Sequence, residues 1–180
     1  MKKFLVVVAI AIFPMLGFSQ SIFDKYEQMD HVAAITINKG LIDLVSSVDI
    51  DGDEDAKEFV ELAKGLNGIK VFVTEDKAVS ADMTASVKKY LKSSSLEELM
   101  RVKDKDINVK FYVKEGKDDN HVNELLMFVS GFENTDLDIN GRKLETVLVT
   151  LTGNIDLRKI GALTKKMNLP KELNNAERGK

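Results

Sequence analysis

The residues that could most plainly do chemistry lie in VDIDGDED, residues 48–55, where five carboxylates surround one glycine. Carboxylate oxygens are the ligands that calcium prefers, and an EF-hand loop places them at fixed positions around a glycine at position 6. With Gly52 at position 6, the acidic side chains at loop positions 3, 5, 9 and 12 are candidate calcium ligands. These are Asp49, Asp51, Asp55 and Glu58.

Two residues of this loop oppose calcium binding. Ser47 stands where an EF-hand loop carries its first carboxylate, and Glu54 stands where an apolar side chain is needed. Aspartate and glycine also form turns, and Asp51 or Asp55 could cap a following helix with Glu54 or Glu58 as its capping-box partner. The residues therefore favour an acidic turn between two helices, with calcium binding as the alternative.

A second loop of similar pattern is TDLDINGRKLET, residues 135–146. Asp136, Asp138 and Asn140 occupy ligand positions, but Val147 stands where the loop needs its bidentate glutamate. Asn140 followed by Gly141 is a strong signal for a two-residue turn between paired strands. We therefore predict a β-hairpin here.

A third polar cluster lies in EGKDDNHVNE, residues 115–124. Imidazole and carboxylate groups can bind a divalent metal, but consecutive aspartates between two strands are ordinary turn residues. We favour the turn. The candidate ligands are Asp118, Asp119, His121 and Glu124. The other histidine, His31, has no such cluster around it.

The residue types in this chain argue against most enzyme classes. The chain has no cysteine and two histidines, so it offers no thiol nucleophile and little for a Ser/His/Asp site. No GxSxG, HExxH or P-loop pattern occurs. Paired carboxylates are plentiful, so a carboxylate hydrolase stays open as a minor alternative. No cofactor is implied.

The N-terminus predicts export. Lys2 and Lys3 precede an apolar run over residues 4–13, followed by Pro14 and small residues up to Ser19. This pattern is typical of a cleaved signal peptide spanning residues 1–19, which would leave no transmembrane segment and a periplasmic or secreted protein. The net charge of −3, with acidic and basic residues evenly mixed, argues against nucleic acid as a partner.

The elements that must position these side chains follow from hydrophobic periodicity. Helical spacing appears over residues 21–30, 41–48, 53–66 and 83–91, and β-branched runs over residues 31–38 and 69–74 predict strands. From residue 96 a succession of strands follows, until Asp156 caps a closing helix with the apolar stripe Leu157, Ile160, Leu163 and Met167.

Alternation within the late strands predicts one buried and one solvated sheet face. In residues 107–115 and 146–152, valine and leucine alternate with polar residues. We therefore predict an α+β fold in one domain, residues 20–169. Its antiparallel or mixed sheet would end in a C-terminal strand meander and carry helices mainly on one face, with residues 170–180 as a flexible tail. The solvated face would carry Tyr112, Thr146, Thr150 and Thr152 as candidate binding residues.

Several segments together resemble a known family. They are SIFDKYEQMDHVAAITINKGLIDLV, LEELMRVKDKDINVKFYVKE, VNELLMFVSGF and VLVTLTGNIDLRKIGALTKKM. The chain is similar in these to the secreted family catalogued as domain of unknown function 4252, found chiefly in Bacteroidetes. The resemblance implies a cell-envelope protein without assigned catalytic residues. We expect a non-enzymatic module that binds a protein partner in the envelope, or alternatively a periplasmic protein that binds a small ligand or calcium.

Overall fold

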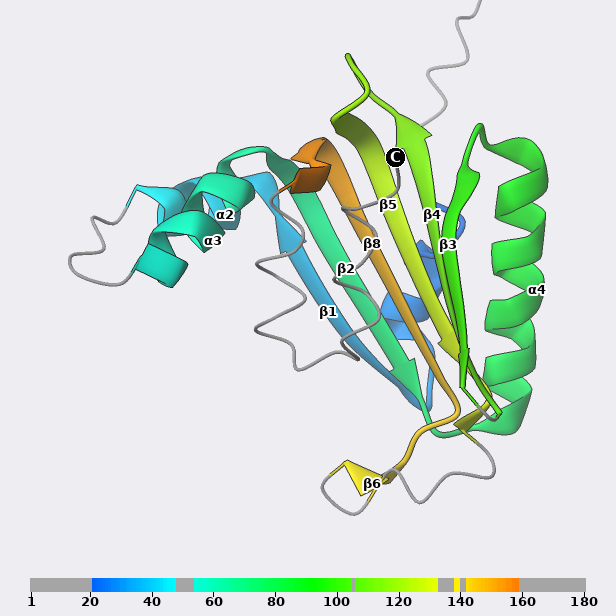
Figure 1. The fold of residues 1–180 in the computed structure, drawn as a ribbon. Helices are drawn as coiled ribbons and strands as arrows, with labels where there is room; N and C mark the ends of the chain where they lie inside the picture. Colours follow the sequence, from blue (N-terminus) through cyan, green and yellow to red (C-terminus); the bar gives the residue numbers. More distant parts are fainter. Residues whose placement is uncertain (1–20, 48–53, 105, 133–137, 140–141, 159–180) are drawn as a thin grey trace, which may run out of the picture.

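The protein is built on one antiparallel six-stranded sheet (Figure 1). The computed structural model describes residues 21–47, 54–104, 106–132, 138–139 and 142–158. Along the sheet the strands follow the order β1-β2-β8-β5-β4-β3. Their bounds are β1 Val32–Asn38, β2 Leu66–Thr74, β3 Glu97–Asp104, β4 Ile107–Glu115, β5 His121–Ser130 and β8 Thr146–Asp156. The predicted α+β class with an antiparallel sheet is confirmed.

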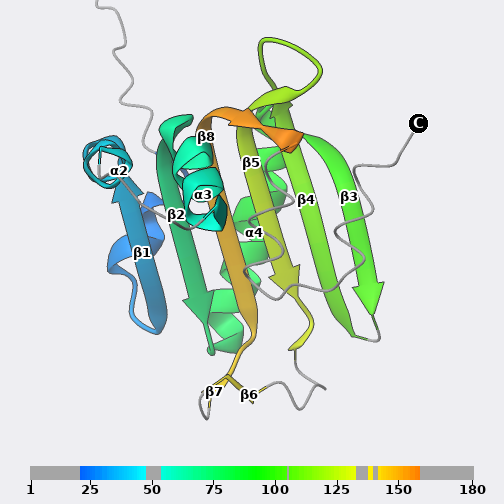
Figure 2. The ribbon, with the colours of Figure 1, turned by 60° about the vertical axis from the view of Figure 1, so that its left-hand side comes forward.

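The strand order brings residues far apart in the chain into register. β8 lies between β2 and β5, with Val149 opposite Val71 on one side and opposite Met127 on the other. β1 and β3 therefore form the two edges of the sheet (Figure 2). Before β8 enters the sheet, β6 (Asp138–Ile139) pairs with β7 (Arg142–Lys143), as the predicted hairpin requires.

Helices cover both faces of this sheet. The 17-residue helix α4 (Lys77–Ser93) and the 3-10 helix η1 (Asp24–Gln28) lie on one face, whereas α2 (Lys39–Ser46) and α3 (Glu54–Lys64) lie on the other (Figure 2). The prediction that helices pack mainly on one face is therefore wrong. The physical reason is the central strand β5, whose run of consecutive apolar residues gives both faces side chains that must leave water.

Two apolar clusters result from this arrangement. Tyr26, Phe72, Met83 and Leu148 belong to the cluster under α4 and η1, and each is less than 1% exposed. The cluster on the other face joins Ile42 of α2 and Leu62 of α3 to alternate residues of the strands. Burial of this kind yields about 25 cal/mol for each Å² of apolar surface and is the main stabilising contribution to the fold.

Local sequence explains where the long helix begins. The side chain of Asp76 accepts hydrogen bonds from the backbone N–H of Ala78 (2.8 Å) and Val79 (2.9 Å), so it caps α4. Met83 and Val87, four residues apart, are buried against the sheet. The helix predicted from this spacing is confirmed, whereas the opening helix predicted over residues 21–30 is the shorter 3-10 helix η1.

A glycine lies where β8 contacts the turn before β2. Gly153 has a φ of 138°, and a Cβ there would lie 2.3 Å from the carbonyl oxygen of Gly65. The next backbone N–H, of Asn154, donates to that same carbonyl at 2.7 Å. Only glycine permits both the backbone conformation and the close approach.

Candidate functional site

The acidic stretch of residues 48–55 falls largely outside the described residues. Asp49 and Asp51 are among residues 48–53, which are not described, and of Asp55 and Glu58 only the backbone of α3 is. The calcium hypothesis at these four positions therefore stays a prediction. Within the described part of the chain, no group of three or more histidine, aspartate or glutamate side chains could hold a metal ion.

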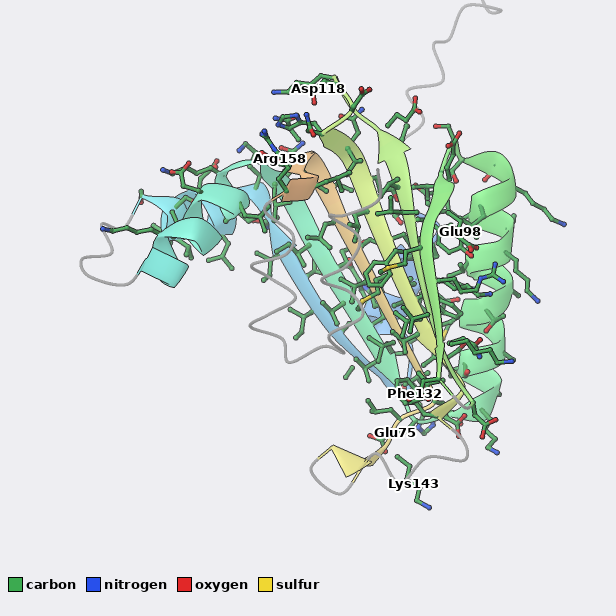
Figure 3. The ribbon with its side chains drawn as sticks, in the orientation of Figure 1. Glu75, Glu98, Asp118, Phe132, Lys143 and Arg158 are labelled. Atoms are coloured by element: carbon green, nitrogen blue, oxygen red, sulfur yellow. The ribbon has the colours of Figure 1, made fainter. Side chains whose placement is uncertain are left out.

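The third polar cluster does not converge on one point. Nδ1 of His121 lies 2.7 Å from Oδ1 of Asp118, which also accepts the backbone N–H of Asn120 at 3.0 Å. These contacts close the turn between β4 and β5, at the same end of the sheet as Arg158 (Figure 3). Glu124 instead bonds to Tyr90 of α4. The turn interpretation is the one that these contacts favour.

The sheet face predicted to be solvated is covered. Thr146 is 0% exposed, Thr150 is 6% exposed and Tyr112 is 9% exposed, because they lie on the face under α4 and η1. Of the four predicted binding residues only Thr152 is exposed. The Oγ atoms of Ser80 and Thr146 lie 2.6 Å apart, so a buried threonine finds its partner on α4. This face is not an open binding surface.

Two tyrosines bring polar groups into the contact between α4 and the rest of the molecule. The Tyr26 hydroxyl donates to Oδ2 of Asp82 at 2.7 Å and lies 2.8 Å from Oγ of Ser86. Tyr90 lies 2.9 Å from both carboxylate oxygens of Glu124. Burial raises the pKa of the Glu124 carboxyl, and burial together with the charge of Glu124 raises the pKa of Tyr90. These groups hold α4 on the sheet.

Salt bridges hold η1 in a similar way. Nζ of Lys70 on β2 lies 2.5 Å from Asp24 and 2.7 Å from Glu27, both on η1. Glu27 also accepts a hydrogen bond from Thr36 of β1 at 3.0 Å. The hydrogen bond from Lys70 lowers the pKa of Glu27. η1 is therefore fixed to the same face of the sheet as α4.

Exposed apolar side chains gather beside one edge of the sheet. Ile35 of β1 is 58% exposed, and α2, which begins at the residue after β1, exposes Leu41 (46%), Leu44 (64%) and Val45 (43%). We call these four residues the β1–α2 surface. Among the described residues the other large apolar side chain that is comparably exposed is Leu99 of β3. The β1–α2 surface is the described region that most resembles a contact surface.

The two edge strands differ sharply in chemistry. β1, with the sequence VAAITIN, carries no charge, proline or glycine and pairs with β2 without a register shift. β3, with the sequence EELMRVKD, carries five charged side chains and a register shift between Glu98 and Met100. Glu98 and Arg101 form a salt bridge on this strand at 2.6 Å. Charges and bulges are the devices that keep an edge strand from pairing, and β1 has neither.

A comparison with family models matches residues 26–163 to the domain of unknown function DUF4252. The chain belongs to this family. Comparison with curated proteins and with solved structures finds no match. The DUF4252 match runs from η1 past β8, so it includes every strand described above.

Membership in DUF4252 brings no site residues with it, so the geometry must supply them. Sequence reasoning missed the β1–α2 surface, although the absence of charge in residues 32–38 was a visible signal for it. It also missed the contact between Tyr90 and Glu124, for which no local pattern exists. No helix among the described residues combines the length and the apolar character needed to cross a membrane.

Proposed function

We propose that this DUF4252 chain is a non-enzymatic protein-binding module of the cell envelope that pairs, through the free edge of β1, with an extended segment of a partner. Export across the inner membrane is supported by the basic and apolar pattern of residues 1–19. The envelope of Bacteroidetes is the setting that the sequence resemblance suggests. Calcium binding at Asp49, Asp51, Asp55 and Glu58 remains the alternative.

The observation that carries the proposal is the uncharged, regular edge strand β1 beside exposed Ile35, Leu41 and Leu44. One side of an edge strand presents main-chain N–H and C=O groups that have no partner within the sheet. A partner strand would bond to these groups, and its side chains would meet those of β1. Since β1 is neutral and rich in β-branched residues, the fitting partner is a neutral, β-branched segment rather than a charged one.

Residue chemistry supports a binding role over catalysis. The hydroxyls of Tyr26, Tyr90 and Thr146 have structural partners, whereas among the described residues the buried Oγ atoms of Ser46 and Ser94 have no hydrogen-bond partner. Glu124, whose carboxyl has a raised pKa, is half-buried and accepts a hydrogen bond from Tyr90 of α4. A carboxylate hydrolase needs two facing acids at a substrate, and this carboxyl instead faces a tyrosine.

The test is affinity purification from the envelope of the source organism, followed by identification of the retained protein and direct binding with the purified pair. Ile35→Lys places a charge on the β1 edge, and Leu99→Lys makes the same change on the β3 edge as a matched control. We expect at least about tenfold weaker binding for Ile35→Lys and no change for Leu99→Lys. Equal affinity of the identified partner for wild type and Ile35→Lys would refute the proposal.

A further inference from the structure

We infer that the strand received by the β1 edge is β1 of a second copy of this chain, paired antiparallel about a two-fold axis through Ile35. This inference rests on the proposed function and names its partner. The two sheets would then join into one, with β1 of each copy at the centre. The composition of β1, its surroundings and the opposite edge of the sheet each support this pairing.

The composition of β1 is complementary to itself. Pairing about Ile35 sets Ile35 opposite Ile35 and Ala33 opposite Ile37, so the small alanine faces the larger isoleucine on both sides of the axis. Val32 falls opposite Asn38. No two charges meet anywhere in this register, because β1 has none. A strand that carried charge would set like charges together in many such registers.

The apolar surroundings of β1 favour the same arrangement. Ile35 lies opposite Val71 of β2, and Val71 and Ile37 both pack against the apolar cluster that includes Ile42 of α2. Side chains two residues apart on a strand share a face, so Ile35 lies on the same face of β1 as Ile37, and it is 58% exposed there. A second β1 would set its own Ile35 against this exposed side chain.

The opposite edge explains why assembly would stop at two copies. A two-fold interface uses the same surface on both subunits and is closed once formed. The joined sheet would then end on β3 at each side, where five charged residues and the shift between Glu98 and Met100 oppose further pairing. One neutral edge strand and one charged edge strand together favour a dimer, whereas two neutral edge strands would allow a fibre.

The experiment measures the mass in solution of the purified mature protein, without the predicted signal peptide of residues 1–19, by sedimentation equilibrium. We expect twice the mass of one mature chain, as mass spectrometry gives it, for wild type and for Leu99→Lys. Ile35→Lys and Ile35→Glu should each sediment as monomers, because a two-fold axis sets each new charge against its own copy. An equimolar mixture of these two variants should recover the dimer, since lysine then faces glutamate. Circular dichroism spectra and melting curves establish that each variant is folded.

Each outcome decides between the proposals. Recovery of the dimer in the mixture supports the two-fold register. A wild-type chain that stays monomeric up to about 100 μM overturns the second-copy inference. In that case the proposed function still holds if Ile35→Lys abolishes binding of an identified envelope protein. If Ile35→Lys leaves that binding unchanged, the proposed function fails together with the second-copy inference. A dimer that persists in Ile35→Lys places the interface elsewhere and overturns the inference as well.

Discussion

The hydroxyl oxygen of Tyr90 on α4 lies 2.9 Å from both carboxylate oxygens of Glu124 on β5. Phe23, just before η1, packs edge-on against the Tyr90 ring with centroids 5.1 Å apart. One side chain of α4 thus joins the central strand to the segment that leads into η1. Because Glu124 is half-buried, its carboxylate depends on this donor.

Replacement of Tyr90 by phenylalanine should therefore destabilise the protein. The ring and its packing on Phe23 are retained, but the Glu124 carboxylate loses its hydrogen-bond donor, which costs about 1–3 kcal/mol for a buried polar group. Urea unfolding gives the free energy of unfolding. In the Tyr90→Phe/Glu124→Gln double variant the change in the free energy of unfolding should be less unfavourable than the sum of the two single changes. Additive changes would contradict a direct interaction between the two side chains.

The raised pKa of Glu124 predicts a pH dependence of stability. Burial raises this pKa in the folded state above its ordinary value of 4.5, so the folded protein binds the proton more tightly than the unfolded chain. The ionised carboxylate therefore destabilises the fold at neutral pH, and this effect disappears as the pH falls through the raised pKa towards 4.5. As the pH rises from about 4 to about 7, the free energy of unfolding of wild type should therefore fall relative to that of Glu124→Gln, as measured by urea unfolding. If the difference in free energy of unfolding between Glu124→Gln and wild type did not change with pH, the raised pKa of Glu124 would be contradicted.

Replacement of Gly153 by alanine should be strongly destabilising. The new Cβ would lie 2.3 Å from the Gly65 carbonyl oxygen, and the residue would have to keep a φ of 138°. The contact between β8 and the turn before β2 must therefore distort. We expect a loss of about 2 kcal/mol or more, or failure to accumulate as folded protein. Gly40→Ala on α2 is the control, because its Cβ would meet only the Asn38 side chain at 3.5 Å, and it should stabilise by up to about 1 kcal/mol. Similar effects of the two substitutions would show that Gly153 is not structurally required.

Calcium should leave the melting temperature unchanged if residues 48–55 form an acidic turn. Ser47 and Glu54 lack the groups that an EF-hand loop needs at their positions, so millimolar calcium should have no specific effect. Differential scanning calorimetry with calcium and with a chelator measures this. A rise in melting temperature that Asp51→Ala abolishes and Asp118→Ala retains would instead establish the calcium alternative.

Periodicity in the sequence predicted much of the secondary structure, because local patterns record which side chains share a face. Met83 and Val87 marked α4, alternation from Ile107 onward marked β4, and Asn140 with Gly141 marked the hairpin of β6 and β7. Of the predicted closing helix the structure describes only Leu157 and Arg158, which are helical; the remainder of that prediction falls outside the described residues. Composition likewise excluded thiol chemistry without any knowledge of the fold, and the N-terminal pattern predicts export.

Tertiary structure alone decided what covers each face and which edge is free. Alternation distinguishes the two faces of a strand, but it does not say whether water or a helix lies against the polar one, and Thr146 and Thr150 proved to be buried under α4 and η1. Pairing between distant segments is likewise absent from local pattern, so the insertion of β8 between β2 and β5 could not be predicted. That order leaves β1 on an edge. The absence of charge in residues 32–38 favours pairing with another strand only at an edge, because only there do main-chain groups lack a partner within the sheet.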